Sequence, residues 1–448
     1  MSPWKSNRIT PAQIIMLGFL FLILTGTLLL MLPFATRSGR PASFWDALFS
    51  AVSATCVTGL VVHDTYTYWS VFGQGVLLTL IQVGGMGVVT MAVAVSIFTG
   101  RKIGLKQRIV MQESISAPQM GGIVRTTSFI LKATLLLEGA GAALLALRFC
   151  PQMGLLKGLW FSVFHAVSAF CNAGFDLMGV TAPFSSLTAY VGDPLVNLPI
   201  MSLIVIGGLG FLVWSDLRQN RLHFRAYRLQ TKLVLTTTLI LLVLPAAYFF
   251  FYEFTLPAWE GMTMGERFLA SLFQSVTPRT AGFNTVDLTL LQGPSVLIMT
   301  LLMLIGGSPG STAGGFKTTA LAMLFLCIRA AFQRRDSVQG FQRRIPPEVL
   351  RHTVSLLTLY ITFFLAGGIL ICCMDGVSLT AALFECASAV GTVGLSLGIT
   401  GELSLSSRFI LILLMYFGRV GGLTMLYAVA SNHAPVPAQL PQEKIAVG

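Results

Sequence analysis

The sequence predicts an all-α, multi-pass membrane protein built from four related repeats. The first reason is composition, because the 448 residues are 54% hydrophobic and only 10% charged. An ordinary soluble domain has about 25% charged residues, so lipid rather than water must cover much of this chain. The second reason is a set of uninterrupted apolar runs long enough to cross a bilayer, for example 14–31, 233–251 and 355–373.

Four short segments share one pattern, in which an apolar stretch ends in a loop of small residues. The sequences are LFSAVSATCVTGL (48–60), VFHAVSAFCNAGF (163–175), SLFQSVTPRTAGF (271–283) and LFECASAVGTVGL (383–395). We call the glycine near the end of each loop the anchor glycine; these are Gly59, Gly174, Gly282 and Gly394. A phenylalanine precedes the anchor glycine by ten residues in three repeats and by nine in repeat three, which is therefore offset by one.

A glycine pair in the apolar helix that follows is the second shared landmark. It occurs in IQVGGMG (81–87), IVIGGLG (204–210), MLIGGSPG (303–310) and YFGRVGG (416–422), with its first glycine 25, 33, 24 and 24 residues after the anchor glycine. Two landmarks that recur at similar spacing predict four structural units. Their expected limits are 1–100, 101–228, 229–340, which has a broken second helix, and 341–448, which ends in a short cytoplasmic tail.

Each unit is expected to contain a long first helix, a short re-entrant segment and a second helix. First helices are predicted at about 11–32, 125–149, 231–254 and 352–374, and second helices at about 74–98, 195–214, 295–328 and 408–430. Crossing ~30 Å of hydrocarbon takes about 20 helical residues, so this gives eight spans. Thr10-Pro11 predicts the start of the first helix, and Ser43 with Asp46, and Ser378, predict the starts of two re-entrant segments.

The distribution of charge predicts the orientation. The N-terminus, the three loops between repeats and the tail hold 19 of the 29 Lys and Arg residues, whereas the opposite side holds 11 of the 17 acidic residues. Basic loops stay on the cytoplasmic side, so both termini are expected in the cytoplasm of a bacterial cell and the glycine loops are expected to open outward. The net charge of +12 is thus explained without a nucleic-acid partner.

The re-entrant segments predict a central ion pore. Non-helical backbone at membrane depth is tolerated only where it is buried in protein or lines an aqueous cavity. Four pseudo-symmetric loops would meet on one axis, where their carbonyl oxygens replace the water around a cation and the half-helix C-termini add partial negative charge. The candidate filter residues are Cys56, Val57, Thr58, Gly59, Cys171, Asn172, Ala173, Gly174, Arg279, Thr280, Ala281, Gly282, Gly391, Thr392, Val393 and Gly394.

These loops carry no ring of carboxylates, which favours a large monovalent cation over calcium or magnesium. At this point the sequence resembles the Trk/Ktr/HKT superfamily of potassium transporters, by the four glycine loops, the Arg-Thr-Ala-Gly-Phe-Asn stretch and the glycine-rich break in repeat three. Its length is most similar to KtrB-type membrane subunits. The resemblance implies potassium bound at filter carbonyls, no organic cofactor in this chain, a homodimer with one pore per protomer, a cytoplasmic nucleotide-binding RCK ring, and sodium-stimulated uptake.

The stretch GGSPGSTAGGFKTT (306–319) must interrupt the second helix of repeat three, because proline removes a hydrogen-bond donor and glycines weaken the helix. We expect a mobile intramembrane loop that acts as a gate; the alternative is a passive kink. The candidate gate residues are Gly306, Gly307, Ser308, Pro309, Gly310, Ser311, Thr312, Ala313, Gly314, Gly315, Phe316, Lys317 and Arg419.

Arg419 stands where the other three repeats have glycine, and a charge inside a span is a functional candidate. It would hinder cations near the axis or pair with carbonyls of the gate loop; the alternative is a structural pair elsewhere. Arg279 lies at a loop mouth and is either structural or shapes the approach of ions. Glu138 and Lys132 lie in a first helix, where the direction of Glu138 is open and a structural role is expected for it.

Other classes of protein fit less well. An alternating-access secondary transporter for another ion or small solute is the main alternative, but it would favour inverted repeats and polar midplane side chains. A membrane enzyme would need a His/Asp/Glu constellation, which is absent, so no enzymatic activity is expected. The seven cysteines show no metal-ligand spacing and no disulfide framework.

Overall fold

The computed structural model describes residues 10–98, 104–114, 122–221, 223–422 and 425. These ranges are helical apart from loops, short 3-10 turns and one small hairpin, β1 (Gln339–Gly340) with β2 (Arg343–Arg344), so the predicted all-α class is confirmed. The four predicted first helices are also confirmed, as α1 (Pro11–Leu30), α7 (Ile123–Met153), α11 (Leu229–Phe251) and α15 (Pro347–Asp375). Each is long and apolar enough to cross a membrane.

The helix starts follow the local signals in the sequence. Thr10 and Gln13 form a capping box, in which the Thr10 hydroxyl accepts from the Gln13 backbone N–H at 3.3 Å and the Gln13 side chain accepts from the Thr10 N–H at 3.0 Å. Ser43 accepts from the Asp46 backbone N–H at 3.1 Å, and Ser378 accepts in the same way from Ala381. These bonds satisfy N–H groups that a helix cannot pair internally.

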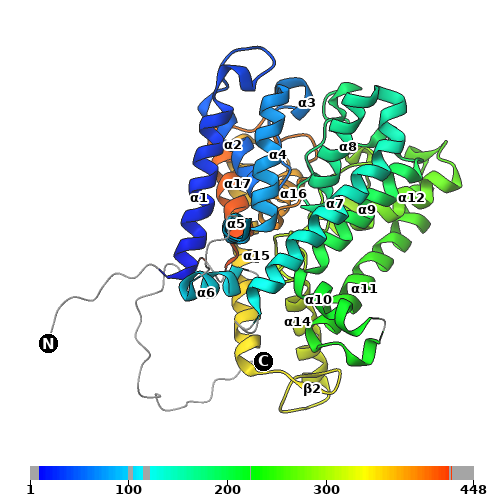
Figure 1. Ribbon diagram of the computed structural model, residues 1–448. Coiled ribbons are helices and arrows are strands. Elements are labelled where there is room, and N and C mark those ends of the chain that lie inside the picture. Colours follow the sequence, from blue (N-terminus) through cyan, green and yellow to red (C-terminus); the bar gives the residue numbers. More distant parts are fainter. Residues whose placement is uncertain (1–9, 99–103, 115–121, 222, 423–424, 426–448) are drawn as a thin grey trace.

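Each repeat contains a helix too short to span, as predicted. These are α2 (Phe44–Thr55), α8 (Leu155–Phe170), α12 (Met264–Val276) and α16 (Leu379–Gly391), with 12 to 16 residues each. At 1.5 Å per residue they reach about 18 to 24 Å, which is less than the hydrocarbon thickness. Figure 1 places α8 near the end of the molecule that holds α3 (Thr65–Tyr68), while α6 (Leu105–Ser114) and the hairpin lie at the opposite end.

The second helices of repeats one, two and four differ from the prediction, because each of these is interrupted as well. Repeat one has α4 (Val71–Met86) and α5 (Val88–Phe98), and repeat two has α9 (Pro194–Leu209) and α10 (Phe211–Asn220), joined at a bend of 94°. The residues at the breaks are Gly87, Gly210 and, after α17 (Leu405–Val420), Gly421, with φ of 85°, 95° and 90°. Only glycine adopts such angles without strain, so these glycines are hinges.

Repeat three shows the predicted long interruption, between α13 (Gly293–Leu304) and α14 (Thr318–Phe332). In the described part of the chain, four helices pass as uninterrupted spans, or five when the bent pair α9 and α10 is counted as one. The expected eight long spans are therefore wrong as single helices. The part of the span predicted at 408–430 that follows 422 lies, apart from residue 425, outside the described residues.

Close approach of backbones explains the first glycine of the pair in repeats one, two and four. A methyl group added to Gly84 would overlap the carbonyl oxygen of Thr55, the last residue of α2. A methyl group added to Gly207 would overlap the Phe170 carbonyl at the end of α8. One added to Gly418 would overlap the Val390 carbonyl near the end of α16. The pairs thus let the second helices pass directly behind the ends of the re-entrant helices.

Candidate ion pathway

The four anchor glycines form a closed ring. A methyl group added to Gly59 would overlap Ala173 of repeat two, and one on Gly174 would lie 2.8 Å from the Cα of Gly282 in repeat three. A methyl group on Gly282 would meet Val393 of repeat four, and one on Gly394 would overlap Thr58 of repeat one. Each loop therefore touches the next, in chain order, and the fourth returns to the first. We call this set of loops the glycine ring.

The same backbone conformation recurs in all four loops. The residue two before the anchor glycine is left-handed, with φ of 53° at Val57, 58° at Asn172, 64° at Thr280 and 53° at Thr392. The anchor glycine is left-handed as well, with φ of 92°, 67°, 79° and 94° in the four repeats. Left-handed angles at a non-glycine residue cost on the order of 1 kcal/mol or more, so the surrounding structure must hold these loops in place.

Hydrogen bonds to the re-entrant helices hold them. The N–H of the residue before the anchor glycine donates to a helix carbonyl, from Thr58 to Ser53 at 2.8 Å, and equivalent bonds of 2.8 to 3.0 Å occur in the other repeats. The Ser53 hydroxyl also accepts from the Gly59 N–H at 3.1 Å, and the Ser388 hydroxyl from Gly394 at 3.0 Å. These bonds pair N–H groups of the loops with the re-entrant helices and fix the loop backbone against them.

These hydroxyl residues were not identified from the sequence, although a signal was present. A serine stands six residues before the anchor glycine in repeats one, two and four: Ser53, Ser168 and Ser388. In repeat three the equivalent is Thr277, five residues before, which shows the same one-residue offset as the phenylalanine. Ser168 and Thr277 donate to the carbonyls of Phe175 and Phe283 at 2.7 and 2.6 Å.

A cavity of about 590 Å³ lies on one side of the glycine ring and is lined by all four anchor glycines. Its wall carries four acidic residues, Asp64, Asp176, Asp287 and Glu402, and none of its described lining residues is basic. Burial raises the pKa of Asp176 to about 7, with a smaller upward contribution from Asp64, while the Met178 N–H that donates to it acts in the opposite direction. A cavity lined by one sign of charge concentrates counter-ions, here cations.

A second cavity, of about 460 Å³, is lined by the interrupted stretch of repeat three together with Gly85, Phe211 and Arg419. Here 305–317 forms a compact loop between α13 and α14. Gly306 donates to the Phe316 carbonyl at 2.8 Å, and the Lys317 ammonium donates to the carbonyls of Ala313 and Gly314 at 2.9 and 3.2 Å. We call residues 305–317 the intramembrane loop.

The intramembrane loop is tied to repeat two and to the glycine ring. Ser308 donates its N–H to the Gly208 carbonyl at 3.0 Å, and Phe211 donates to Gly310 at 2.7 Å. The Thr312 hydroxyl lies 2.9 Å from the side-chain oxygen of Asn172 and 3.1 Å from the Phe170 carbonyl, and its single O–H can donate to either. Asn172 is one of the left-handed residues of the ring, so the loop contacts the ring directly.

Arg419 joins the intramembrane loop to repeat one. Its guanidinium donates to the Thr312 carbonyl and to the carbonyls of Gly84 and Gly85, the last at 2.8 Å. The two glycine carbonyls belong to the C-terminal turn of α4, where carbonyls lack intrahelical partners and a cation is favoured. None of the ion pairs in the described ranges involves Arg419, so its partners there are backbone oxygens.

Three further residues can now be placed. Glu138 is buried and faces the interior, where Gln82 donates to its carboxylate at 3.3 Å and the Cys171 sulfur lies 4.0 Å from it. Arg279 is buried behind the ring, with its guanidinium 3.4 Å from the Thr238 hydroxyl of α11. Lys132 is exposed and lines a surface cavity.

Comparison with known proteins identifies the class. Residues 7–435 match the model of the TrkH family, described as cation transport proteins. The chain is 40% identical over 431 residues to Ktr system potassium uptake protein B of Bacillus subtilis, covering 96% of this chain and 95% of that protein. It is 36% identical to potassium/sodium uptake protein NtpJ of Enterococcus hirae, covering 99% and 98%.

A solved structure agrees in fold. The potassium transporter TrkH from Vibrio parahaemolyticus superposes with a TM-score of 0.72 at 20% identity, covering 94% of this chain and 85% of that one. The fold and the family match define a membrane cation transport protein. The chain belongs to the TrkH family, which confirms the resemblance seen in the sequence.

Proposed function

We propose that this chain is the potassium-translocating membrane subunit of a bacterial potassium uptake system, and that the glycine ring is its selectivity filter. The observation that carries the proposal is the closed contact of four loops with one shared backbone conformation. Relatives of 40% and 36% identity that are named as potassium and potassium/sodium uptake proteins support the choice of ion.

The chemistry follows from the direction of the loop hydrogen bonds. Loop N–H groups are used by the re-entrant helices, which leaves carbonyl oxygens as the polar groups available to an ion that has lost its water. The ends of α2, α8, α12 and α16 add partial negative charge. Asp64, Asp176, Asp287 and Glu402 raise the cation concentration on the outer side. All sixteen candidate filter residues belong to this proposal.

The intramembrane loop is proposed as the gate. It lines one cavity while the anchor glycines line the other, so it lies on the inner side of the ring. A single hydrogen bond between backbone groups attaches the loop to Gly208, and another from the Arg419 guanidinium attaches it to that side chain. Both bonds can break without unfolding a helix. Opening would release the loop from α4 and clear the inner cavity.

Regulation is proposed to come from outside this chain. The name "Ktr system" of two relatives from Bacillus subtilis implies partner subunits, and we propose a cytoplasmic nucleotide-binding RCK ring and a homodimer. The potassium/sodium name of the Enterococcus relative motivates sodium stimulation. With both termini in the cytoplasm, the acidic cavity faces outward. The proposal keeps the four repeats at the limits expected from the sequence.

The test is rescue of a potassium-uptake-deficient bacterium at low external potassium, with the chain alone and with a candidate regulatory subunit. Gly282→Ser should lower the preference for potassium over sodium, because the added Cβ would overlap Val393 and distort the ring. Gly139→Ser is the matched control, since a Cβ there meets nothing within 4 Å. Unchanged selectivity after serine substitution at all four anchor glycines would remove the filter assignment.

A further inference from the structure

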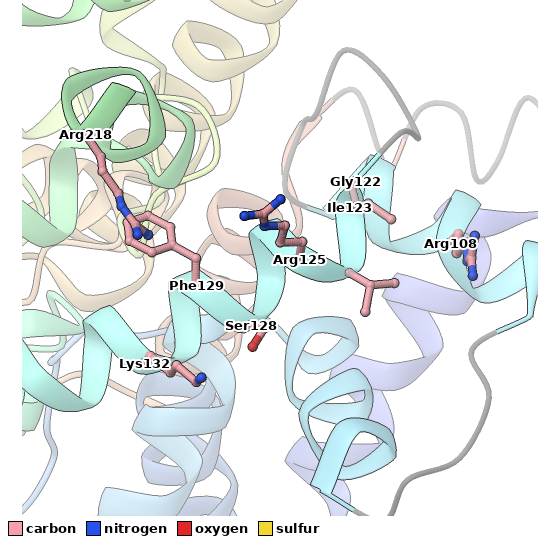
Figure 2. A pocket seen from close by; sticks show the side chains of 9 residues that line it. Arg108, Gly122, Ile123, Arg125, Ser128, Phe129, Lys132 and Arg218 are labelled. Atoms are coloured by element: carbon pink, nitrogen blue, oxygen red, sulfur yellow. The ribbon is translucent and has the colours of Figure 1, made fainter. Parts of the chain in front are cut away.

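A basic surface cavity of about 700 Å³ lies where α6, α7 and α10 meet, far from the glycine ring. Figure 2 shows Arg218 of α10 above the ring of Phe129, Arg125 further along α7, and Arg108 on the neighbouring helix α6. Lys132 and Ser128 complete the polar part of the wall. Nothing in the potassium pathway uses these residues.

The cavity carries four positive charges and no compensating negative charge among its described lining residues. Arg108, Arg125, Lys132 and Arg218 are all exposed, and none takes part in an ion pair within the described ranges. The Arg218 guanidinium is held 4.8 Å from the centre of the Phe129 ring, which orients its planar donors. Four cations around one hollow, without an ion-pair partner among the described residues, favour a multiply hydrogen-bonded anion such as phosphate.

The backbone adds donors at the same place. Helix α7 has 31 residues and begins at Ile123, directly after the N-cap Gly122, which has no side chain to cap it. The first N–H groups of a helix have no intrahelical partner, and its N-terminus carries about half a positive charge. Gly122, Ile123 and Arg125 all line the cavity, so this end of α7 faces the same hollow as the four cations.

The surroundings point to a lipid rather than to a soluble anion. Lys132 lies seven residues beyond Arg125, about 10 Å further along the helix axis, and enters the apolar part of α7. The next turn exposes Leu135 by 63% and Leu136 by 73%, as a helix facing acyl chains would. A lysine at such a depth directs its ammonium toward the headgroup level. A free phosphate would use the cations but not the adjoining apolar surface.

We propose that this cavity binds the phosphate headgroup of an anionic phospholipid, with its acyl chains along Leu135 and Leu136. Arg125 and Arg218 contact the phosphate, Lys132 reaches it from the acyl side, and Arg108 adds long-range attraction. Each basic residue near a membrane surface contributes roughly fivefold to the affinity for an anionic lipid, so loss of two should weaken binding about 25-fold.

Native mass spectrometry of the full chain tests this, with phosphatidylglycerol, phosphatidylcholine and inorganic phosphate as separate probes. The expected result is a preference for phosphatidylglycerol that falls about 25-fold in Arg125→Gln/Arg218→Gln. The matched control is Arg225→Gln/Arg343→Gln, which removes two exposed arginines outside the cavity and should bind as the wild type does.

Three results would overturn the proposal. One is unchanged phosphatidylglycerol binding in the cavity variant, and another is an equal loss in the control, which would indicate general surface charge. The third is retention of inorganic phosphate as tightly as phosphatidylglycerol, which would assign the site to a free anion.

Discussion

Replacing Arg419 by glutamine tests how firmly the intramembrane loop is held. Three hydrogen bonds leave the Arg419 guanidinium, two to α4 and one to the Thr312 carbonyl of the loop. Only the bond to Thr312 must break when the loop moves away from α4. A buried hydrogen bond from a charged donor contributes about 1.5–3 kcal/mol. Its loss should therefore favour the open state by at least tenfold.

The assay measures potassium flux into proteoliposomes that contain the purified chain without a regulatory subunit. Arg419→Gln should raise this basal flux about tenfold, and Arg419→Lys should raise it less, because lysine keeps the charge but loses the planar fork. Arg408→Gln is the control, since Arg408 pairs with Asp46 at 3.5 Å, away from the loop. Wild-type flux in Arg419→Gln, together with reduced thermal stability, would leave Arg419 a structural role only and refute the gate argument.

Three other changes follow from the structure. Because burial raises the pKa of Asp176 to about 7, its carboxyl is largely neutral below that pH and charged above it. Uptake at low potassium should therefore rise between pH 6 and 8, and Asp176→Asn should flatten this pH profile. A slope that persists in Asp176→Asn would exclude Asp176 as the source of the pH dependence. Ser388→Ala leaves the partly buried Gly394 N–H without its 3.0 Å acceptor, which should cost about 1 kcal/mol of stability and lower selectivity, measured by thermal unfolding and competitive uptake. Ser404→Ala, at the start of α17, should spare selectivity. Glu138→Gln keeps the shape of the side chain and should preserve transport. Glu138→Ala removes the partner of Gln82 and should lower the melting temperature. An equal loss of transport in both variants would show that the charge itself is needed.

Local sequence signals predicted the re-entrant helices well. The re-entrant segment expected to begin after Ser43 is α2 (Phe44–Thr55), because Ser43 caps one end and the small-residue loop ends the other. The interruption in repeat three was also predictable, since no helix tolerates proline and five glycines in one stretch. Both features depend on backbone chemistry within a few residues, which a sequence displays directly.

Other features depend on contacts between distant segments and were not predictable. Gly87 and Gly210 become hinges with positive φ, but the same residues are compatible with a continuous helix until the re-entrant helices approach. The direction of Glu138 was open because α7 is apolar on nearly all sides, so no face of the helix marks the interior. Its partners Gln82 and Cys171 come from two other elements.

The contact between Thr312 and Asn172 has a thermodynamic consequence. Thr312 belongs to the intramembrane loop and Asn172 to the glycine ring, so displacement of the loop removes a hydrogen bond from the ring. Binding linkage is reciprocal: if loop displacement changes the affinity of the ring for an ion, ion occupancy changes the equilibrium of the loop by the same factor. A regulator that works through the loop would then sense, across the membrane, how well the outer solution supplies the ion.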